Sequence, residues 1–122
     1  MARKFTTALI AQAIEGTDPV ISSVQHADLL GSADELVFQV TTTQVSTQQA
    51  NAQLTLKYSH SNDGQGFASK SNNVFTTVNL SNNLTLMSDP VAGNGAYGQI
   101  EVTLADASDK AFVRVIACGR VD

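Results

Sequence analysis

The sequence predicts an all-β protein, an antiparallel β-sandwich with seven to eight strands in jelly-roll or immunoglobulin-like order. Three observations support this fold class. Apolar and polar residues alternate with a period of two, clusters of turn residues separate the alternating segments, and the segments recur roughly every ten residues. The connections between them are short, which favours antiparallel strands because parallel strands need long crossovers.

The alternation places strands at residues 20–24, 35–40, 54–59, 74–80, 84–87, 99–104 and 112–117. Successive side chains of a strand point to opposite faces, so each segment can turn one face to a core and the other to water. The last segment differs because it is apolar on both faces apart from Arg114. We therefore expect it to be a central strand or to be covered on both sides.

Turn residues indicate how these strands are joined. The stretch Asn62-Asp63-Gly64 predicts a hairpin or loop, because Asn and Asp tolerate the left-handed backbone and Gly adopts it freely. Ser81-Asn82-Asn83 predicts a tight hairpin between residues 74–80 and 84–87. Residues 106–109 join the last two strands.

The N-terminal segment is predicted to be an arm over residues 1–19, distinct from a sandwich domain over residues 20–122. The apolar side chains of this candidate assembly arm are Phe5, Leu9, Ile10 and Ile14. Their spacing fits a short helix, an extended arm or an edge strand. Two roles stay open: the arm reaches a neighbouring subunit, or it folds back and adds a strand to its own sheet.

Composition excludes several classes of protein. The net charge is −4 with only seven Lys and Arg residues, which argues against nucleic-acid binding. No apolar run approaches the roughly 18 residues of a membrane-spanning helix. Cys118 is the only cysteine, so no intrachain disulfide forms and a reducing compartment is expected. Ser, Thr, Asn and Gln make up 40 of the 122 residues, a weakly charged surface that suits close packing of many copies.

No motif in the sequence predicts a catalytic, cofactor or metal site, and we expect no enzymatic activity. Residues 93–98 read G-x-G-x-x-G, but a strand and not a helix follows them, so a loop is favoured over a nucleotide site. His26 and His60 have no His or Cys at metal-ligand spacing. No serine lies in a nucleophile elbow, and Cys118 lies in an apolar strand, where a buried structural cysteine is the common case.

Three segments together resemble small β-sandwich structural proteins, of the capsid decoration type, from tailed phages and phage-derived particles. The segments are residues 54–67 (LTLKYSHSNDGQGF), residues 111–117 (AFVRVIA) and residues 35–40 (ELVFQV). The pattern of strand, tight turn and aromatic residue carries the resemblance, although Phe67 stands where those proteins usually have Trp. The resemblance implies a virion or particle subunit and carries over no catalytic residue.

The expected function is that of a non-enzymatic virion structural subunit, a phage capsid or capsid decoration (cement) protein that acts by multivalent packing. Its expected partners are copies of itself, a major capsid protein, or both, with no nucleic acid, membrane or cofactor. The expected location is the virion, assembled in the host cytoplasm. The alternative is a carbohydrate- or host-surface-binding module that uses the loops at residues 61–73 and 88–98.

Overall fold

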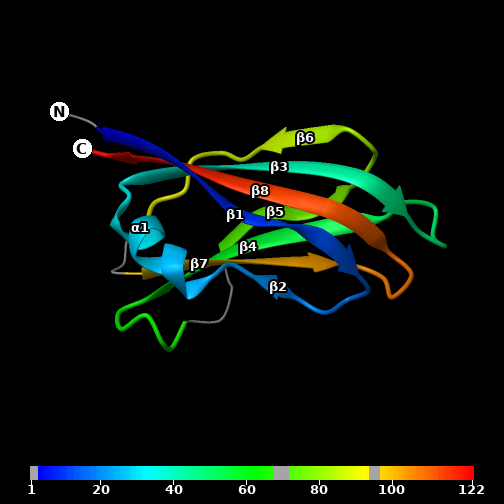
Figure 1. Cartoon of the computed structure of the whole chain (residues 1–122), viewed down its shortest axis with the longest axis horizontal. Coiled ribbons are helices and arrows are strands. Elements are labelled where there is room, and N and C mark those ends of the chain that lie inside the picture. Colours follow the sequence, from blue (N-terminus) through cyan, green and yellow to red (C-terminus); the bar gives the residue numbers. More distant parts are fainter. Residues whose placement is uncertain (1–2, 68–71, 94–96) are drawn as a thin grey trace.

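A computed structural model of the chain describes residues 3–67, 72–93 and 97–122 (Figure 1). Over these residues the chain forms two antiparallel sheets of four strands each, which confirms the predicted β-sandwich. In order, the first sheet contains β1 (Arg3–Glu15), β8 (Lys110–Val121), β3 (Glu35–Ser46) and β6 (Leu84–Met87). The second contains β2 (Val20–Ile21), β7 (Tyr97–Leu104), β4 (Gln53–Ser61) and β5 (Asn72–Asn79).

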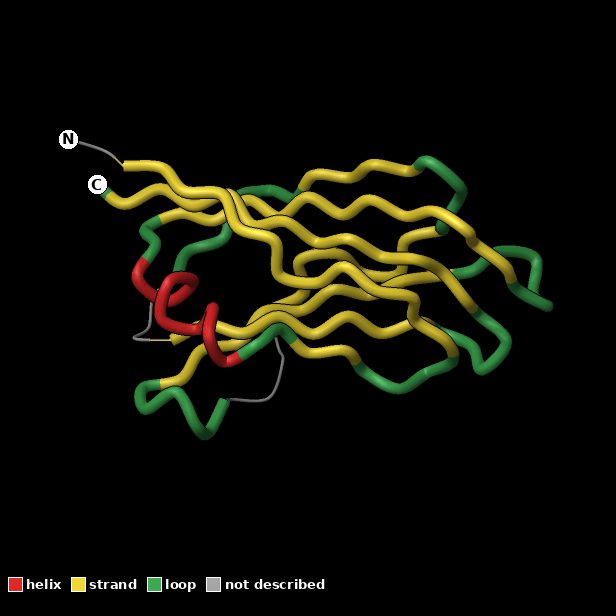
Figure 2. The backbone as a smooth tube through the Cα atoms, viewed as in Figure 1, coloured by secondary structure: helices red, strands yellow, loops and turns green. Residues whose placement is uncertain are grey.

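The strand order is that of a jelly roll. Strand β1 pairs with β8, β2 with β7, β3 with β6 and β4 with β5, so the described strands form nested antiparallel pairs. Additional pairing of β3 with β8 and of β4 with β7 completes the two sheets (Figure 2). This order, two sheets built from one folded ribbon, decides between the two topologies that the sequence left open.

One predicted hairpin is wrong. The strands on either side of Ser81-Asn82-Asn83, β5 and β6, lie in different sheets and pair with β4 and β3. Asn83 does adopt the left-handed backbone that the sequence suggested, with φ of 62°. The prediction of a turn at these residues is therefore correct, but the turn connects strands that lie in different sheets.

A short helix, α1 (Ala27–Ser32), was not predicted. It follows a 3-10 turn (Val24–His26), and no side chain caps its first residue. Leu30 is fully buried and Ala27 nearly so, and the helix lies against β7. Tertiary burial holds this element, since a helix of this length has little stability of its own.

The predicted arm lies in the first sheet as the edge strand β1, paired along its length with β8. A β-bulge at Leu9 breaks the alternation of the strand, so that Leu9 and Ile10 are both buried. Ile14 is also buried, and the half-buried Phe5 packs against the same core. Strand β1 thus belongs to the same sandwich as residues 20–122, and a role of residues 1–19 in assembly remains a prediction.

Gly119 makes room for Phe5 on the neighbouring strand. The two residues are directly opposite each other, and a Cβ on Gly119 would lie 2.1 Å from Phe5 Cζ. We expect Gly119→Ala to lower the free energy of unfolding by about 1–3 kcal/mol, the usual cost of overpacking, and to loosen the start of β1. Urea denaturation and hydrogen exchange of residues 3–8 measure both effects. The double variant with Phe5→Ala should lose less than the sum of the single variants; strict additivity would contradict the contact.

The core joins the two sheets through Phe38 on β3 and Tyr58 on β4, both fully buried. Their ring centroids are 5.8 Å apart, and the ring of His60 meets Tyr58 edge-on at 4.8 Å. The Tyr58 hydroxyl donates to the carbonyl of Leu30 at 3.4 Å, which ties the second sheet to α1. Burial raises the pKa of Tyr58 to about 12.

This shift predicts alkaline destabilisation. The folded state holds the Tyr58 proton more tightly than the unfolded state, where the pKa is near the ordinary value of 10.0. The stabilisation is therefore complete below about pH 10 and is lost as the pH rises toward about 12. Tyrosinate absorbance followed together with circular dichroism should show Tyr58 ionising only as the protein unfolds. Ionisation of both tyrosines at pH 10 in the folded protein would contradict this.

Asp109 links the turns at the end of the sandwich opposite the two chain termini through hydrogen bonds. Its carboxylate is 1% exposed and accepts hydrogen bonds from the Thr47 hydroxyl (2.5 Å) and the backbone N–H groups of Gln53 (3.3 Å) and Asp106 (3.2 Å). Its carbonyl accepts from the N–H of Gly16, at the β1–β2 turn. One buried side chain thus joins the β3–β4 and β7–β8 connections, and its backbone adds the β1–β2 turn.

Candidate functional site

The outer face of the first sheet is the most distinctive surface of the described residues. Alternate residues of its strands point away from the second sheet, and the register sets them in rows across the sheet. One row contains Ala8, Ile116, Gln39 and Met87. The next contains Ala11, Arg114, Thr41 and Thr85.

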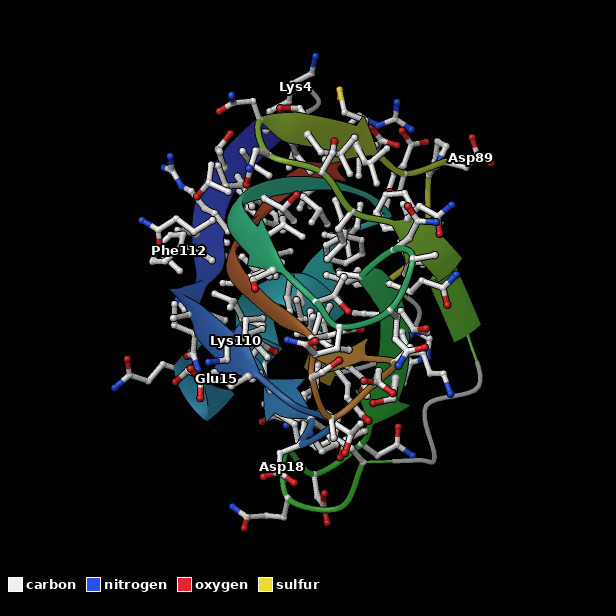
Figure 3. All side chains as sticks on the ribbon, turned by 90° about the vertical axis from the view of Figure 1, so that its right-hand side faces the viewer. Lys4, Glu15, Asp18, Asp89, Lys110 and Phe112 are labelled. Atoms are coloured by element: carbon white, nitrogen blue, oxygen red, sulfur yellow. The ribbon has the colours of Figure 1, made fainter. Side chains whose placement is uncertain are left out.

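The middle of this outer face is made of apolar and small side chains. Phe112 is 36% exposed and Met87 is 67% exposed, and Figure 3 shows Phe112 on the outside of the molecule. The other members are partly or fully exposed: Val37, Ile116, Cys118, Ala8, Ala11 and Ala13. Arg114, Gln39 and Thr41 lie among these apolar residues, so the face combines exposed apolar side chains, which are typical of interaction sites, with polar ones.

Charged side chains lie mainly at the two ends of the outer face. Lys110 pairs with Glu15 at 3.5 Å at one end, where Figure 3 shows the two side chains next to each other. Arg120 pairs with Glu35 at 3.4 Å at the other end. Arg114, in between, has no ion-pair partner among the described residues.

The outer face of the second sheet is polar by comparison. Thr55 lies opposite Thr103 on its central pair of strands, and Lys57 lies opposite Glu101. Among the strand residues whose exposure is described, the exposed large apolar side chains are Phe112 and Met87 on the first sheet and Ile21 on the second.

A hollow lies beside the loop that follows β4. Its lining comprises His60, Ser61, Asn62, Gly66 and Phe67. The neighbouring carboxylate of Asp63 accepts from the N–H groups of Gln65 (2.8 Å) and Gly66 (3.0 Å), and these bonds lower its pKa to about 2. This carboxylate therefore stabilises the conformation of its own loop by accepting backbone hydrogen bonds. Parts of the two loops predicted to bind a sugar or a host surface, residues 68–71 and 94–96, lie outside the described residues.

The glycine motif and His60, considered above as possible chemical sites, are accounted for by their places in the fold. Gly93 packs closely against the carbonyl of Ala33, and Gly98 lies within β7, so the described part of the glycine motif leads into a strand as expected. His60 lies 3.4 Å from the carbonyl of Ala92. Within the described ranges, no group of three or more His, Cys, Asp or Glu residues is arranged to hold a metal ion. No helix in these ranges is both long enough and apolar enough to cross a bilayer.

The four side chains of the predicted assembly arm come together on the inner side of the first sheet. Leu9, Ile10 and Ile14 are buried in the core, and Phe5 covers Gly119. The exposed residues of the outer face were not identified from the sequence as a site. The sequence feature that could have identified this face is that residues 112–117 are apolar on both sides of the strand apart from Arg114. Strand β8 is central in its sheet, as expected, but no described element covers its outer side.

Comparison with solved structures finds the same fold in infectious bursal disease virus and in a PBSX exported protein. The structure of infectious bursal disease virus strain Gx matches 98% of this chain with a TM-score of 0.61 and 6% sequence identity. The PBSX exported protein XepA matches 97% with a TM-score of 0.58 and 14% identity. A mutant VP2 protein of infectious bursal disease virus, in derived T=1 particles, matches 98% with a TM-score of 0.58 and 9% identity.

These similarities establish a shared fold. The chain spans about a third of the length of these proteins, between 32% and 38% of each. No protein-family model and no curated protein matches the sequence.

Proposed function

We propose that the chain is a non-enzymatic structural subunit of a virion, a capsid or capsid decoration protein that acts by multivalent packing. The observation that carries the proposal is a jelly roll that exposes Phe112 and Met87 on one broad outer face, in a fold shared with a viral protein of T=1 particles. A sheet face of this kind provides a broad, flat contact area, which suits repeated packing better than chemistry in a cleft. The proposed location is the virion, after assembly in the host cytoplasm, with copies of the chain or a major capsid protein as neighbours.

Sedimentation of particles from the producing cells tests this function. We expect the chain to travel with a particle fraction in a density gradient and to be visible there by electron microscopy at regular positions. A chain that stays strictly monomeric and is missing from every particle fraction would overturn the proposal.

The assembly arm forms a second part of the proposal. Strand β1 is an edge strand that contributes Leu9, Ile10 and Ile14 to the core, and Gly16 (φ 72°) and Pro19 follow it in the connection to β2. Exchange of β1 between neighbouring subunits would bury the same side chains in a second copy, at little cost in contacts.

A disulfide can report this exchange. The Thr6 hydroxyl lies 3.6 Å from the Cys118 sulfur across the β1–β8 pair, so Thr6→Cys places two thiols opposite each other. In assembled material, an exchanged strand gives covalent dimers on a non-reducing gel. A crosslink that forms only within single chains would reject the arm as an exchanged element while leaving the structural function intact.

The hollow beside the β4–β5 loop favours a second candidate function, binding of a carbohydrate or host surface. It combines the amide of Asn62 with the ring of Phe67, and amide and aromatic groups together suit recognition of a sugar. A glycan array probed with the wild type and with Asn62→Ala separates this candidate from the first. Binding that Asn62→Ala removes would support it, and an array without any bound glycan would discard it.

A further inference from the structure

We infer that the outer face of the first sheet docks onto another protein whose surface is apolar and places a carboxylate opposite Arg114. The inference rests on the proposed structural function and deepens it, because it states which face makes the contact and what chemistry the partner must have. Three observations lead to it, concerning β8, the environment of Arg114, and the charge of the face.

The first observation is that the outer side of β8 carries the apolar residues Phe112 and Ile116 between its cations and is left uncovered. Its inner residues, such as Val113 and Val115, are fully buried in the core. Its outer residues Phe112 and Ile116 face outward, and no other described element lies over them. Phe112 is 36% exposed on this side, and covering it together with Ile116 removes apolar surface from water.

The second observation concerns the surroundings of Arg114. Its neighbours across the sheet are Ala11 on β1 and Thr41 on β3, both uncharged. The other cations of β8, Lys110 and Arg120, each have a carboxylate at the matching position. A partner that covers the face removes water from Arg114, and an unpaired buried charge is strongly unfavourable. A carboxylate on the partner is the group that compensates it, with a geometry that the guanidinium can bind through two hydrogen bonds.

The third observation argues against a second copy packed face to face. The outer face carries four cations, Lys4, Lys110, Arg114 and Arg120, against the three carboxylates of Glu15, Glu35 and Asp122, whereas the whole chain has a net charge of −4. A two-fold axis through the middle of the face would bring two like-charged faces together, with Arg114 of each copy near the centre. Like charges in contact are costly and reject such a pairing. The face complements an acidic, apolar surface on a protein other than this one.

Cys118 provides a direct measurement of this contact. It is the only cysteine, and it lies on the outer face between Thr6 and Val37. The expectation of a buried cysteine is wrong, because residue 118 falls on the outward side of β8 and is exposed. We expect N-ethylmaleimide to modify Cys118 roughly tenfold more slowly in partner-bound protein than in the purified free chain, since thiol reactivity follows exposure. The matched control is Thr103→Cys in a Cys118→Ser background, on the outer face of the second sheet, where the rate should not change. Equal protection at both positions, or none at Cys118, would overturn the inference.

Two substitutions test the chemistry of the partner. Ile116→Asp and Arg114→Glu should each weaken binding of the chain to this partner protein by roughly tenfold or more, as expected for central contact residues. Thr103→Asp, the control, should leave it unchanged. Circular dichroism melting shows whether each variant folds as the wild type does. Association that survives both outer-face variants, when they are folded, would refute the docking face.

A photo-crosslinker at position 11 identifies what lies opposite Arg114. Benzoyl-phenylalanine replaces Ala11 in the producing cells, and mass spectrometry identifies the crosslinked peptide. The expected peptide is apolar, belongs to a different chain and contains Asp or Glu, and reversing that acid to Lys should restore binding of Arg114→Glu. A peptide from this chain itself, one without an acid, or no crosslink would contradict the inference. A matching peptide from a protein outside any virion would keep the docking face and overturn the proposed function instead.

Discussion

Gly98→Ala is expected to lower the free energy of unfolding by about 3 kcal/mol or more. A Cβ at this position would lie 2.0 Å from the Tyr58 hydroxyl oxygen and 2.7 Å from Cζ of the same ring. Tyr58 is fully buried, packs against Phe38 and His60, and therefore has little freedom to move. Overpacking a filled core costs about 1–3 kcal/mol and more where nothing yields. Urea denaturation of wild type and variant measures the difference.

Gly66→Ala is the matched control. A Cβ on Gly66 meets no atom within 4 Å, and its φ is not in the left-handed region. The free energy of unfolding should therefore change by less than about 0.5 kcal/mol, or rise slightly because alanine restricts the unfolded chain. If both variants are equally stable, the Tyr58 ring does not lie against β7, and the link from the second sheet to α1 fails with it.

Asp109→Ala should be comparably destabilising, by about 3 kcal/mol. The substitution removes the acceptors of one hydroxyl and two backbone N–H groups at a site that is 1% exposed. Donors left without a partner away from water cost about 1–3 kcal/mol each, although water entering the space reduces the sum. Urea denaturation gives the magnitude. Hydrogen exchange should show the largest loss of protection at Gln53 and Asp106, whose N–H groups lose their acceptor.

Two further variants separate the loss of the Asp109 hydrogen bonds from the loss of a negative charge. Asp109→Asn keeps one carbonyl oxygen and should fall between the wild type and Asp109→Ala. Asp89→Ala removes a carboxylate from an exposed position and should change stability by less than about 0.5 kcal/mol. Asp109→Ala with the stability of Asp89→Ala would mean that the loops at this end are held by other contacts.

The proposed docking face shows why a surface is harder to predict than a strand. Residues 112–117 are apolar on both faces apart from Arg114, and this predicted that β8 is central or covered on both sides, because each residue's face follows from its position in the strand alone. The rows of the outer face require the register of β8 against β1 and β3, which brings Ala11 and Thr41 beside Arg114. Those residues are far apart in the sequence, and no local pattern relates them.

By itself, the sequence determined the strands other than β1, most of their turns, the all-β class and the absence of a recognisable catalytic motif, since strand periodicity and turn propensity are local properties. Only the tertiary structure decided which strands pair. It placed β5 and β6 in different sheets, chose the jelly-roll order, set β1 beside β8, and formed α1 around the burial of Leu30. The reason is physical: strand pairing and burial depend on contacts between distant residues, and alternating segments of similar composition are compatible with several pairings.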